Sequence, residues 1–456
     1  MDFSSLPLIG EADIVVCGGG TAGTFAAISA ADSGYSVIVA EPTGTLGGAA
    51  VNGLVVPVMN TCIPGNPQCS YISRRLQREL LSAGGVDSSG MNFDPVILGA
   101  MLDRLCLNAG VKIMFYTAVA DAVSEGGRIR EVIAVNKRGI GRIRGKIFID
   151  ATGDGDLSVK AGAEYTSGDP QTGKNQAVSL RYTVSGIDTD RFGGFIRQTV
   201  QKNGGAGADC DADGRISVAC CSGDGWTFSP VFDEAQKNGD LTEDDRVYWQ
   251  GFSVNGRHGC IAFNNPEFFT HNDGTDPADL TFIRIAGRQA ILRQMAFYRQ
   301  YLPGFENAYV SAVAPSVGVR ESRNIVSEYV LTAEDLLSKR KFHDCICRSD
   351  YPVDVHGKGL NFSSVAPADD GKPWYELPFR SLVVRGIDNL LVAGRCLGAD
   401  FTAQSSIRVQ HSARASGEAA GIGAALALSK SLPPREINGA EVRAIMLGRG
   451  ADFGDG

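Results

Sequence analysis

The chain has 456 residues, of which 43% are hydrophobic and 21% are charged. That composition supplies one large or two moderate globular cores and excludes an intrinsically disordered chain. The formal net charge of −8 argues against a nucleic-acid-binding protein, because such proteins normally carry a basic domain. No apolar stretch reaches the ~18 residues of a membrane helix, and the N-terminus has no signal-peptide pattern. We therefore expect a cytoplasmic protein that binds neither nucleic acid nor membrane.

The first predicted elements form a complete β–α–β unit. Residues 13–17 predict a buried strand, residues 25–33 a helix, and residues 36–41 a second strand that ends in an acidic residue, Glu41. A strand, a helix and a strand in such a short stretch are typical of the unit that binds dinucleotides. Glu41, at the end of the second strand, is then placed to hold a ribose diol.

The turn between the first strand and the helix has the pattern G-x-G-x-x-G, formed by Gly18, Gly20 and Gly23. Gly18 permits a tight turn, Gly20 lets a phosphate approach the backbone, and Gly23 allows close packing of the helix on the strand. The N-terminus of the helix offers its backbone N–H groups to a pyrophosphate. The motif predicts a dinucleotide site, but it does not distinguish NAD from FAD.

The next segments continue the α/β pattern. Helical segments extend to Asn108, and strands are predicted at residues 111–116, 129–136 and 146–150. Residues 137–145, rich in Gly and Arg, are predicted to form a turn between the last two of these strands.

The middle of the chain changes character. Residues 165–315 are richer in aromatic side chains and polar loops, which indicates a second domain that contains β-strands. The α/β pattern returns with a strand at residues 389–394 and one long helix at residues 405–429. We predict an α/β fold with a discontinuous Rossmann-like domain and a mixed α+β substrate or cap domain. The predicted bounds are residues 1–165 and 375–456 for the first domain and residues 166–374 for the second.

The 11 cysteines include no C-x-x-C pair, and no His and Cys residues with the sequence spacing of a zinc site accompany them. We therefore expect no metal site. The cysteines are interpreted as ordinary thiols, since free Cys packs as a small hydrophobic residue. One alternative is a redox pair formed by Cys62 and Cys69 on a segment rich in Pro and Gly.

Two later segments resemble FAD enzymes that are built like glutathione reductase. Residues 150–156 (DATGDGD) resemble the A-T-G segment, where a strand end returns to the dinucleotide site. Residues 391–395 (LVAGR), followed by a long helix, resemble the C-terminal flavin motif. In that motif the N-terminus of the helix points at the flavin and stabilises the negative charge of its reduced form.

Three further segments resemble one family within that group, the FAD-dependent oxidoreductases (FAD_oxidored). They are residues 317–323 (VGVRESR), 328–332 (EYVLT) and 351–356 (YPVDVH). Asn324 stands where the family usually has the second Arg of its G-V-R-E-[ST]-R-R motif, so the role of that cation is not carried over. The resemblance spans residues 12–430. It implies FAD, expected to be bound without a covalent link, and it does not identify the substrate.

The glycine motif and the resemblance together give the expected cofactor site. Its residues are Gly18, Gly20, Thr21, Ala22, Gly23, Glu41, Gly47, Gly48, Val119, Ala151, Thr152, Gly153, Asp154, Gly394, Arg395, Ser405 and Ser406.

Four side chains are candidates for substrate chemistry, with His258 behind them: Arg320, Asp354, His356 and Arg408. An Arg presents a two-pronged donor to a carboxylate, and His356 is suited to take a proton as a hydride leaves. Structural alternatives stand beside these roles. In these alternatives, Arg320 forms only an ion pair with Glu321. Asp354 and His356 form only a structural pair, and His258 is a plain loop residue.

The sequence therefore predicts a FAD-dependent dehydrogenase or reductase. It moves a hydride between flavin N5 and a small organic substrate that is hydroxylated or carboxylated. Oxygen, a nicotinamide or a redox protein is expected as the electron partner, because only one phosphate-binding β–α–β unit is present. One alternative is a FAD-dependent monooxygenase, and another is a redox-partner or RNA-modifying protein that houses FAD. The sequence gives no oligomeric state.

Overall fold

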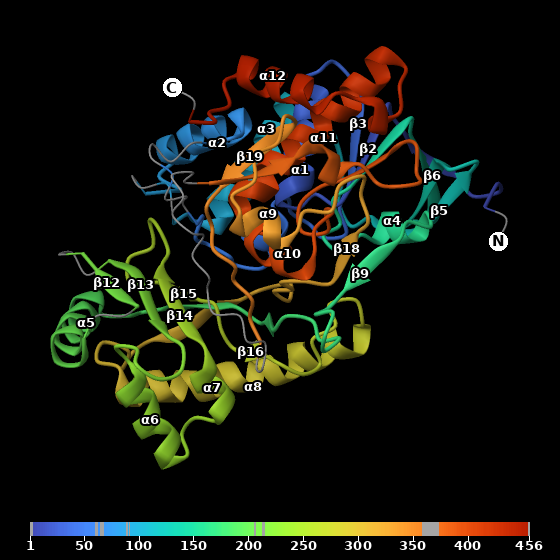
Figure 1. The fold of residues 1–456 in the computed structure, drawn as a ribbon. Helices are drawn as coiled ribbons and strands as arrows, with labels where there is room; N and C mark the ends of the chain where they lie inside the picture. The colour runs from blue at the N-terminus through green and yellow to red at the C-terminus, as the bar shows by residue number, and fades with distance from the viewer. Residues whose placement is uncertain are drawn as a thin grey trace.

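The computed structural model describes residues 3–59, 63, 68–87, 90, 92–204, 207–211, 215–357 and 374–454 (Figure 1). Cys62, one half of the alternative redox pair, lies outside the described residues. Two large sheets, one parallel and one antiparallel, each have a hydrophobic core of their own. The predicted α/β fold with a separate β-containing domain is thereby confirmed. The bounds of the two domains remain a prediction.

The parallel sheet contains the predicted β–α–β unit. Its strands lie in the order β21 (Leu390–Val392), β8 (Ile147–Asp150), β2 (Ile14–Cys17), β3 (Val37–Ala40) and β4 (Lys112–Met114). Every residue of the first four strands is buried, as expected for parallel strands that helices cover. Helix α1 (Thr21–Ala31) follows β2 and packs against helix α11 (Gln410–Lys430). Gly417 and Gly421 permit this approach, because a Cβ at either would overlap a backbone carbonyl of α1.

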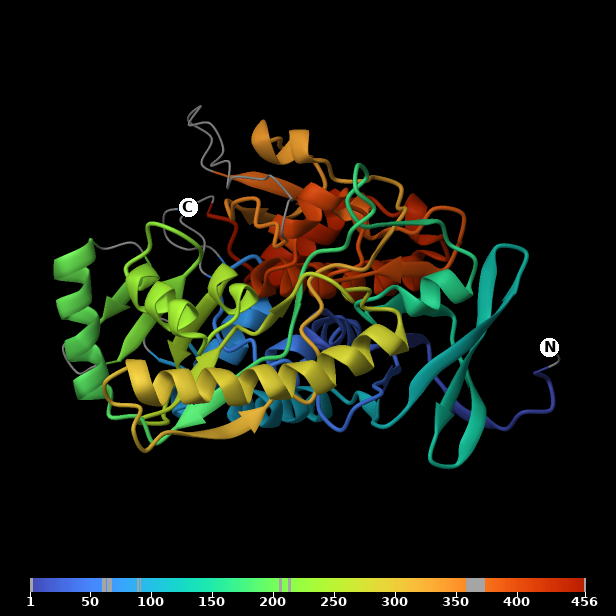
Figure 2. The same ribbon diagram turned by 90° about the horizontal axis from the view of Figure 1, so that it is seen from below.

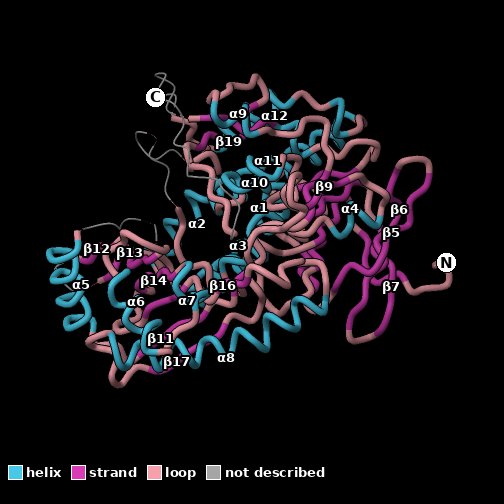
Figure 3. Tube along the Cα trace, turned by 60° about the horizontal axis from the view of Figure 1, so that its bottom comes forward, coloured by secondary structure: helices cyan, strands magenta, loops and turns pink. Residues whose placement is uncertain are grey.

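A four-stranded sheet lies at one end of the molecule (Figures 2 and 3). Its order is β1 (Leu8–Glu11), β7 (Gly139–Arg144), β6 (Arg128–Asn136) and β5 (Ala118–Glu125). The predicted turn at residues 137–145 is wrong, because most of it is strand β7. Asn136 pairs with Gly139, so the turn is only two residues long. Because this segment is rich in Gly and Arg, the sequence does not indicate strand β7, which buries Gly141 and Ile143 on one face.

The antiparallel sheet lies at the opposite end, beside the long helix α8 (Figure 2). Its neighbouring strands are all antiparallel. Their order is β12 (Ala208–Cys210), β13 (Ile216–Cys221), β14 (Trp249–Ser253), β15 (Ile261–Phe263), β11 (Tyr182–Ser185) and β17 (Tyr309–Val313). The helices of this region are α5 (Thr189–Asn203), α6 (Ser229–Asn238), α7 (Glu243–Val247) and α8 (Pro277–Tyr301). Its core is aromatic, and Trp249 Nε1 donates a hydrogen bond to Tyr298 Oη at 2.9 Å.

Shorter elements complete the fold. The strand pairs are β10 (Val178–Ser179) with β16 (Glu267–Phe268), β9 (Tyr165–Ser167) with β18 (Arg323–Ile325), and β19 (Cys345–Ser349) with β20 (Tyr375–Pro378). The remaining helices are α2 (Tyr71–Ser82), α3 (Pro95–Asn108), α4 (Asp156–Lys160), α9 (Ala333–Leu337), α10 (Phe401–Ile407) and α12 (Gly439–Arg449). Short 3-10 turns are η1 (Gly48–Ala50), η2 (Phe379–Leu382) and η3 (Pro434–Glu436). Within the described ranges, no helix is long and apolar enough to cross a membrane.

The single helix predicted for residues 405–429 is two helices. Helix α10 ends at Ile407, and α11 begins at Gln410 after Val409, whose backbone is extended (φ −65°, ψ 154°). Arg408, at the break, donates from Nη2 to the backbone carbonyl of Asp354 at 2.9 Å and to its carboxylate at 3.0 Å. These bonds to a distant segment hold the chain at the break, and helical periodicity carries no sign of them.

Candidate functional site

A cavity of about 680 Å³ lies between the parallel sheet and the antiparallel sheet. On one side it is lined by residues of the glycine motif and of the later segments that the sequence links to it. On the other side it is lined by charged and aromatic residues of the β-containing domain. The predicted site residues in its lining are Gly20, Thr21, Ala22, Gly48, Ala151, Thr152, Gly153, Arg320, Asp354, His356, Gly394, Arg395 and Arg408. Cofactor motifs and substrate candidates thus share one cavity.

The three motif glycines are needed for different reasons. Gly18 has a φ of +93°, and a Cβ there would overlap the Ala151 carbonyl oxygen. A Cβ at Gly23 would overlap the carbonyl oxygen of Gly18. At Gly20, in contrast, a Cβ would meet no described atom closer than 3.9 Å, the Cα of Gly48. The chain packs against the first and third glycines, whereas the second borders open space in the cavity.

Two helix N-termini face this cavity. Helix α1 begins at Thr21 and α11 at Gln410, and both residues lie in the cavity wall. The N-cap residues, Gly20 and Val409, make no side-chain hydrogen bond to the first turn of either helix. The first backbone N–H groups of a helix have no partner within the helix, and the helix dipole adds positive charge at that end. The wall therefore suits anionic groups.

Glu41 braces the glycine turn from behind the cavity wall. One carboxylate oxygen accepts a hydrogen bond from the Gly19 backbone N–H at 2.7 Å. The other accepts from the backbone N–H and the hydroxyl of Thr43 at 2.9 Å and 2.6 Å. The side chain is buried and is not part of the cavity lining. Its contact with a ribose remains a prediction.

Arg395 is held in the cavity wall by two neighbours. It donates from Nη2 to the Asp154 carboxylate at 2.7 Å and from Nη1 to the Ser322 hydroxyl at 2.9 Å. Ser322 in turn donates to the same Asp154 oxygen at 2.6 Å. Asp154 thus positions Arg395 and is not itself in the lining.

The other predicted cofactor residues outside the lining are Gly18, Gly23, Glu41, Gly47, Val119, Ser405 and Ser406. The two serines hold the chain near Asp354. Ser405 accepts from the Asp354 backbone N–H at 3.1 Å, and Ser406 donates to the Pro352 carbonyl at 3.0 Å. His258 lies in an exposed turn after β14, away from the cavity lining.

Arg320 pairs with a residue that the sequence did not indicate. Its guanidinium forms an ion pair with Glu267, and it donates from Nη1 to the Ala177 carbonyl at 2.9 Å. The alternative pair with Glu321 is therefore wrong. Glu321 instead accepts from the Gly168 backbone N–H at 3.0 Å, and burial raises its pKa to about 7.

His356 lies between two carboxylates. Its Nδ1 is 3.0 Å from Glu267 Oε1, and its Nε2 is 3.1 Å from Asp354 Oδ1. The Glu267 side chain is only 2% exposed, whereas that of Asp354 is 32% exposed. Burial acts to raise the pKa of Glu267, but Arg320 and His356 outweigh it and hold that pKa below its ordinary value. Burial is likewise outweighed at Asp354, where His356, Arg408 and Arg320 lower the pKa.

Arg181 lies in the same charged wall of the cavity as Arg320, Asp354 and His356. No motif in the sequence indicated it. The residue is 8% exposed, lines the cavity and has no ion-pair partner among the residues that the structure describes. Burial, followed by repulsion from Arg320, lowers its pKa to about 9. The available signal was a charged residue inside the alternating run at residues 178–184. Tyr248, another missed residue, packs its ring edge-on against His356 at 5.0 Å.

Comparison with known proteins assigns the family. The family described as FAD dependent oxidoreductase matches residues 13–446. The chain belongs to this family. It is an FAD-dependent oxidoreductase, and FAD is the cofactor that the family implies, as the sequence predicts.

The residues of this oxidoreductase fit that cofactor. The space beside the Gly20 backbone is open, and a side chain at that position would fill it. Two helix N-termini without a side-chain cap from their N-cap residues face the same cavity. Both features suit the pyrophosphate of a dinucleotide, because helix N-termini bind anionic groups.

Individual relatives leave the reaction open. Thiamine thiazole synthase of Methanococcus aeolicus is 29% identical over 152 residues, which cover 31% of the oxidoreductase and 55% of that protein. The chain thus spans about half the length of this curated relative. A geranylgeranyl bacteriochlorophyll reductase-like protein of Thermoplasma acidophilum is 12% identical, with a TM-score of 0.49 and coverage of 96% and 83%. The p-nitrophenol 4-monooxygenase of Pseudomonas putida is 11% identical, with a TM-score of 0.45 and coverage of 97% and 87%.

Proposed function

We propose that this oxidoreductase removes a hydride from a small hydroxylated carboxylate. The observation that supports it best is Arg181, a buried cation in the cavity wall with no ion-pair partner in the described part of the chain. A buried charge is costly unless a counter-charge accompanies it. Glu267 and Asp354 form ion pairs with Arg320 and Arg408, and Glu267 attracts Arg181 without forming an ion-pair contact with it. We therefore assign Arg181 to the substrate anion. A guanidinium binds a carboxylate through two parallel hydrogen bonds.

His356 is the proposed proton acceptor. The deeply buried Glu267 faces Nδ1 and fixes the orientation of the ring. Nε2 is directed toward the more exposed Asp354, where a substrate hydroxyl can approach. Imidazole is a suitable base near neutral pH. In the proposed reactive state the substrate hydroxyl enters between Nε2 and Asp354, and the imidazole is neutral with its proton on Nδ1 toward Glu267. As the substrate C–H loses its hydride, the unprotonated Nε2 takes the hydroxyl proton, and the alcohol becomes a carbonyl.

The chemistry that FAD would supply when bound is acceptance of the hydride and passage of its two electrons to the next acceptor. We propose that FAD is held without a covalent link. The acceptor is proposed to be oxygen, a nicotinamide or a redox protein, and a substrate-reduced sample mixed with each will identify it.

The substrate class is tested by anaerobic reduction of the purified holoenzyme. A panel of 2-hydroxy acids is compared with the matching alcohols and amides, and loss of the visible band of oxidised flavin is followed. We expect at least one hydroxy acid to bleach the flavin, while its neutral partners do so more than tenfold more slowly. Equal rates for a hydroxy acid and its amide would overturn the anionic assignment. A hydroxylated product that forms only with oxygen would support a monooxygenase instead.

Two variants separate binding from proton transfer. Arg181→Met loses charge-assisted hydrogen bonds of about 1.5–3 kcal/mol, which raises KM roughly 10- to 150-fold. His356→Gln lowers kcat by about 10²–10⁴, the range of general-base catalysis. Arg288→Met, at an exposed position of α8, is the matched control and is expected to change neither constant. Unchanged KM in Arg181→Met with an intact flavin spectrum contradicts the proposed contact.

A further inference from the structure

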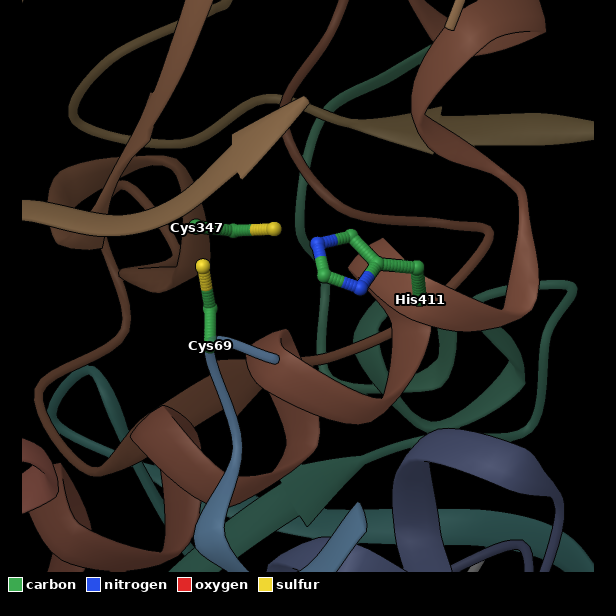
Figure 4. Close-up of side chains that lie close together, drawn as sticks. All are labelled: Cys69, Cys347 and His411. Atoms are coloured by element: carbon green, nitrogen blue, oxygen red, sulfur yellow. The ribbon is translucent and has the colours of Figure 1, made fainter. Parts of the chain in front are cut away.

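Three buried side chains from distant parts of the chain converge outside the charged cavity. Cys69 precedes α2, Cys347 is in β19, and His411 is the second residue of α11. Their ligand atoms all lie within 4.8 Å of one another. The three residues are 1%, 1% and 6% exposed. Figure 4 shows both sulfur atoms and one edge of the imidazole ring turned toward the same point.

We propose that Cys69, Cys347 and His411 bind one Zn²⁺. Thiolate sulfur and imidazole nitrogen are the ligands that zinc prefers in proteins. In a tetrahedral zinc site, with Zn–S near 2.3 Å and Zn–N near 2.0 Å, the ligand atoms stand about 3.5–3.8 Å apart. The three atoms therefore need to approach one another by about 1 Å or less. The sequence predicts no metal site, because its cysteines and histidines lack the local spacing of one. The fold, and not that spacing, brings these three ligands together.

The peptide at Arg348 supplies the immediate surroundings of the cluster. Its carbonyl oxygen is 3.0 Å from His411 Nε2 and 3.6 Å from the Cys347 sulfur. Its N–H donates to the Cys69 sulfur at 3.4 Å. A backbone N–H that donates to sulfur stabilises a thiolate ligand. The carbonyl oxygen is placed to take the fourth position or to hold a water there.

A disulfide between Cys69 and Cys347 is the competing interpretation. It would account for the two sulfur atoms and would leave His411 only its hydrogen bond with the Arg348 carbonyl. A metal ion uses all three groups and forms a neutral site with two thiolates and a neutral imidazole. Because the ligands are buried, the site is structural. It links the segment before α2 and β19 to the start of α11, whose first residue, Gln410, lines the cavity.

Metal content of the full-length protein tests the proposal directly. The protein is expressed with zinc, dialysed, and assayed by elemental analysis; a second sample is loaded with Co²⁺ anaerobically. We expect about one Zn²⁺ per chain and a Co²⁺ spectrum with the intense visible bands of tetrahedral coordination and a sulfur charge-transfer band. Binding is expected to release protons, because thiol and imidazole ligands must be deprotonated to bind a metal. These measurements on the unaltered protein do not depend on the folding of any variant.

Matched variants then assign the ligands. Cys69→Ser, Cys347→Ser and His411→Ala are each expected to lower the metal content at least tenfold. Cys345→Ala, which removes a buried thiol from the same strand, retains the metal. Wild-type protein with less than a tenth of an equivalent of zinc and no cobalt–sulfur band would overturn the proposal. So would two missing free thiols with a mass lower by two hydrogens, since they show a disulfide.

Discussion

Replacing Gly20 with Ala tests whether FAD binds on the open side of the glycine turn. Gly20 has φ −67° and ψ −169°, which alanine adopts without strain. The added Cβ would meet no described atom closer than 3.9 Å. The FAD-free protein should therefore accept the substitution. Its free energy of unfolding is expected to stay the same or rise by up to about 1 kcal/mol, because alanine restricts the unfolded chain.

The effect on FAD follows from where the methyl group would lie. It would stand beside Gly48 and the Ala151 carbonyl, in the space that the motif predicts for the pyrophosphate. Moving the pyrophosphate off one backbone N–H of α1 removes one charge-assisted hydrogen bond, worth about 1.5–3 kcal/mol. That loss corresponds to a roughly 10- to 150-fold rise in the Kd of FAD.

The assay titrates FAD-free protein with FAD and follows flavin fluorescence, while urea unfolding of the same protein reports stability. Gly194→Ala in α5 is the matched control, because a Cβ there meets no described atom within 4 Å. It should leave FAD affinity unchanged and stabilise the helix by about 0.5–1 kcal/mol. Gly23→Ala provides the opposite contrast. Its Cβ overlaps the Gly18 carbonyl oxygen, so the FAD-free protein itself should be destabilised.

Two results would refute the reasoning. If Gly20→Ala folds normally and binds FAD within twofold of the wild type, no part of FAD occupies the space beside Gly20. If Gly20→Ala instead destabilises the FAD-free protein as strongly as Gly23→Ala does, the glycine serves the packing of the chain. The proposed FAD site beside Gly20 is supported only if Gly20→Ala weakens FAD binding without lowering the stability of the FAD-free protein.

Other predictions concern buried polar groups. Burial raises the pKa of Glu418 from 4.5 to about 7, so the folded state holds its proton more tightly than the unfolded state. The resulting stability is complete below pH 4.5 and is lost as the pH rises through 7. Urea unfolding should therefore show wild type losing about 2.5 kcal/mol relative to Glu418→Gln between pH 5 and 8, and parallel curves would contradict this. Tyr298→Phe leaves Trp249 Nε1 without its acceptor, so unfolding should show a loss of about 1–3 kcal/mol at unchanged flavin content; a smaller loss would mean that the indole N–H finds another acceptor.

The elements that local pattern alone determines were predicted well. The strand, turn and helix at the start of the chain follow from a short apolar run, glycines at fixed spacing and an alanine-rich helix. The structure has them as β2, Gly18–Gly23 and α1. Strand β7 was missed because its Gly and Arg residues look like a turn. Its pairing with β6 and the burial of Ile143 depend on neighbours that the local sequence does not reveal.

The charged wall shows why a site can be only half visible in a sequence. His356 and Arg320 belong to segments with a family resemblance, and the structure places both in the cavity lining. Glu267, which contacts both, comes from a short strand without a motif. Arg181 lies between strands β10 and β11, and its approach to the cavity depends on how the two sheets meet. No local pattern carries that information.

The break between α10 and α11 affects both the wall at the N-terminus of α11 and the charged residues around His356. In one continuous helix, Arg408 would be an interior position and no helix would begin at Gln410. Because Val409 is extended, α11 starts at the cavity and directs its positive end there. The same distortion lets Arg408 reach Asp354, the carboxylate that faces His356. One departure from helical periodicity thus shapes the wall that we propose for the cofactor and holds an acidic neighbour of the proposed base, so both proposed roles depend on residues 408–410.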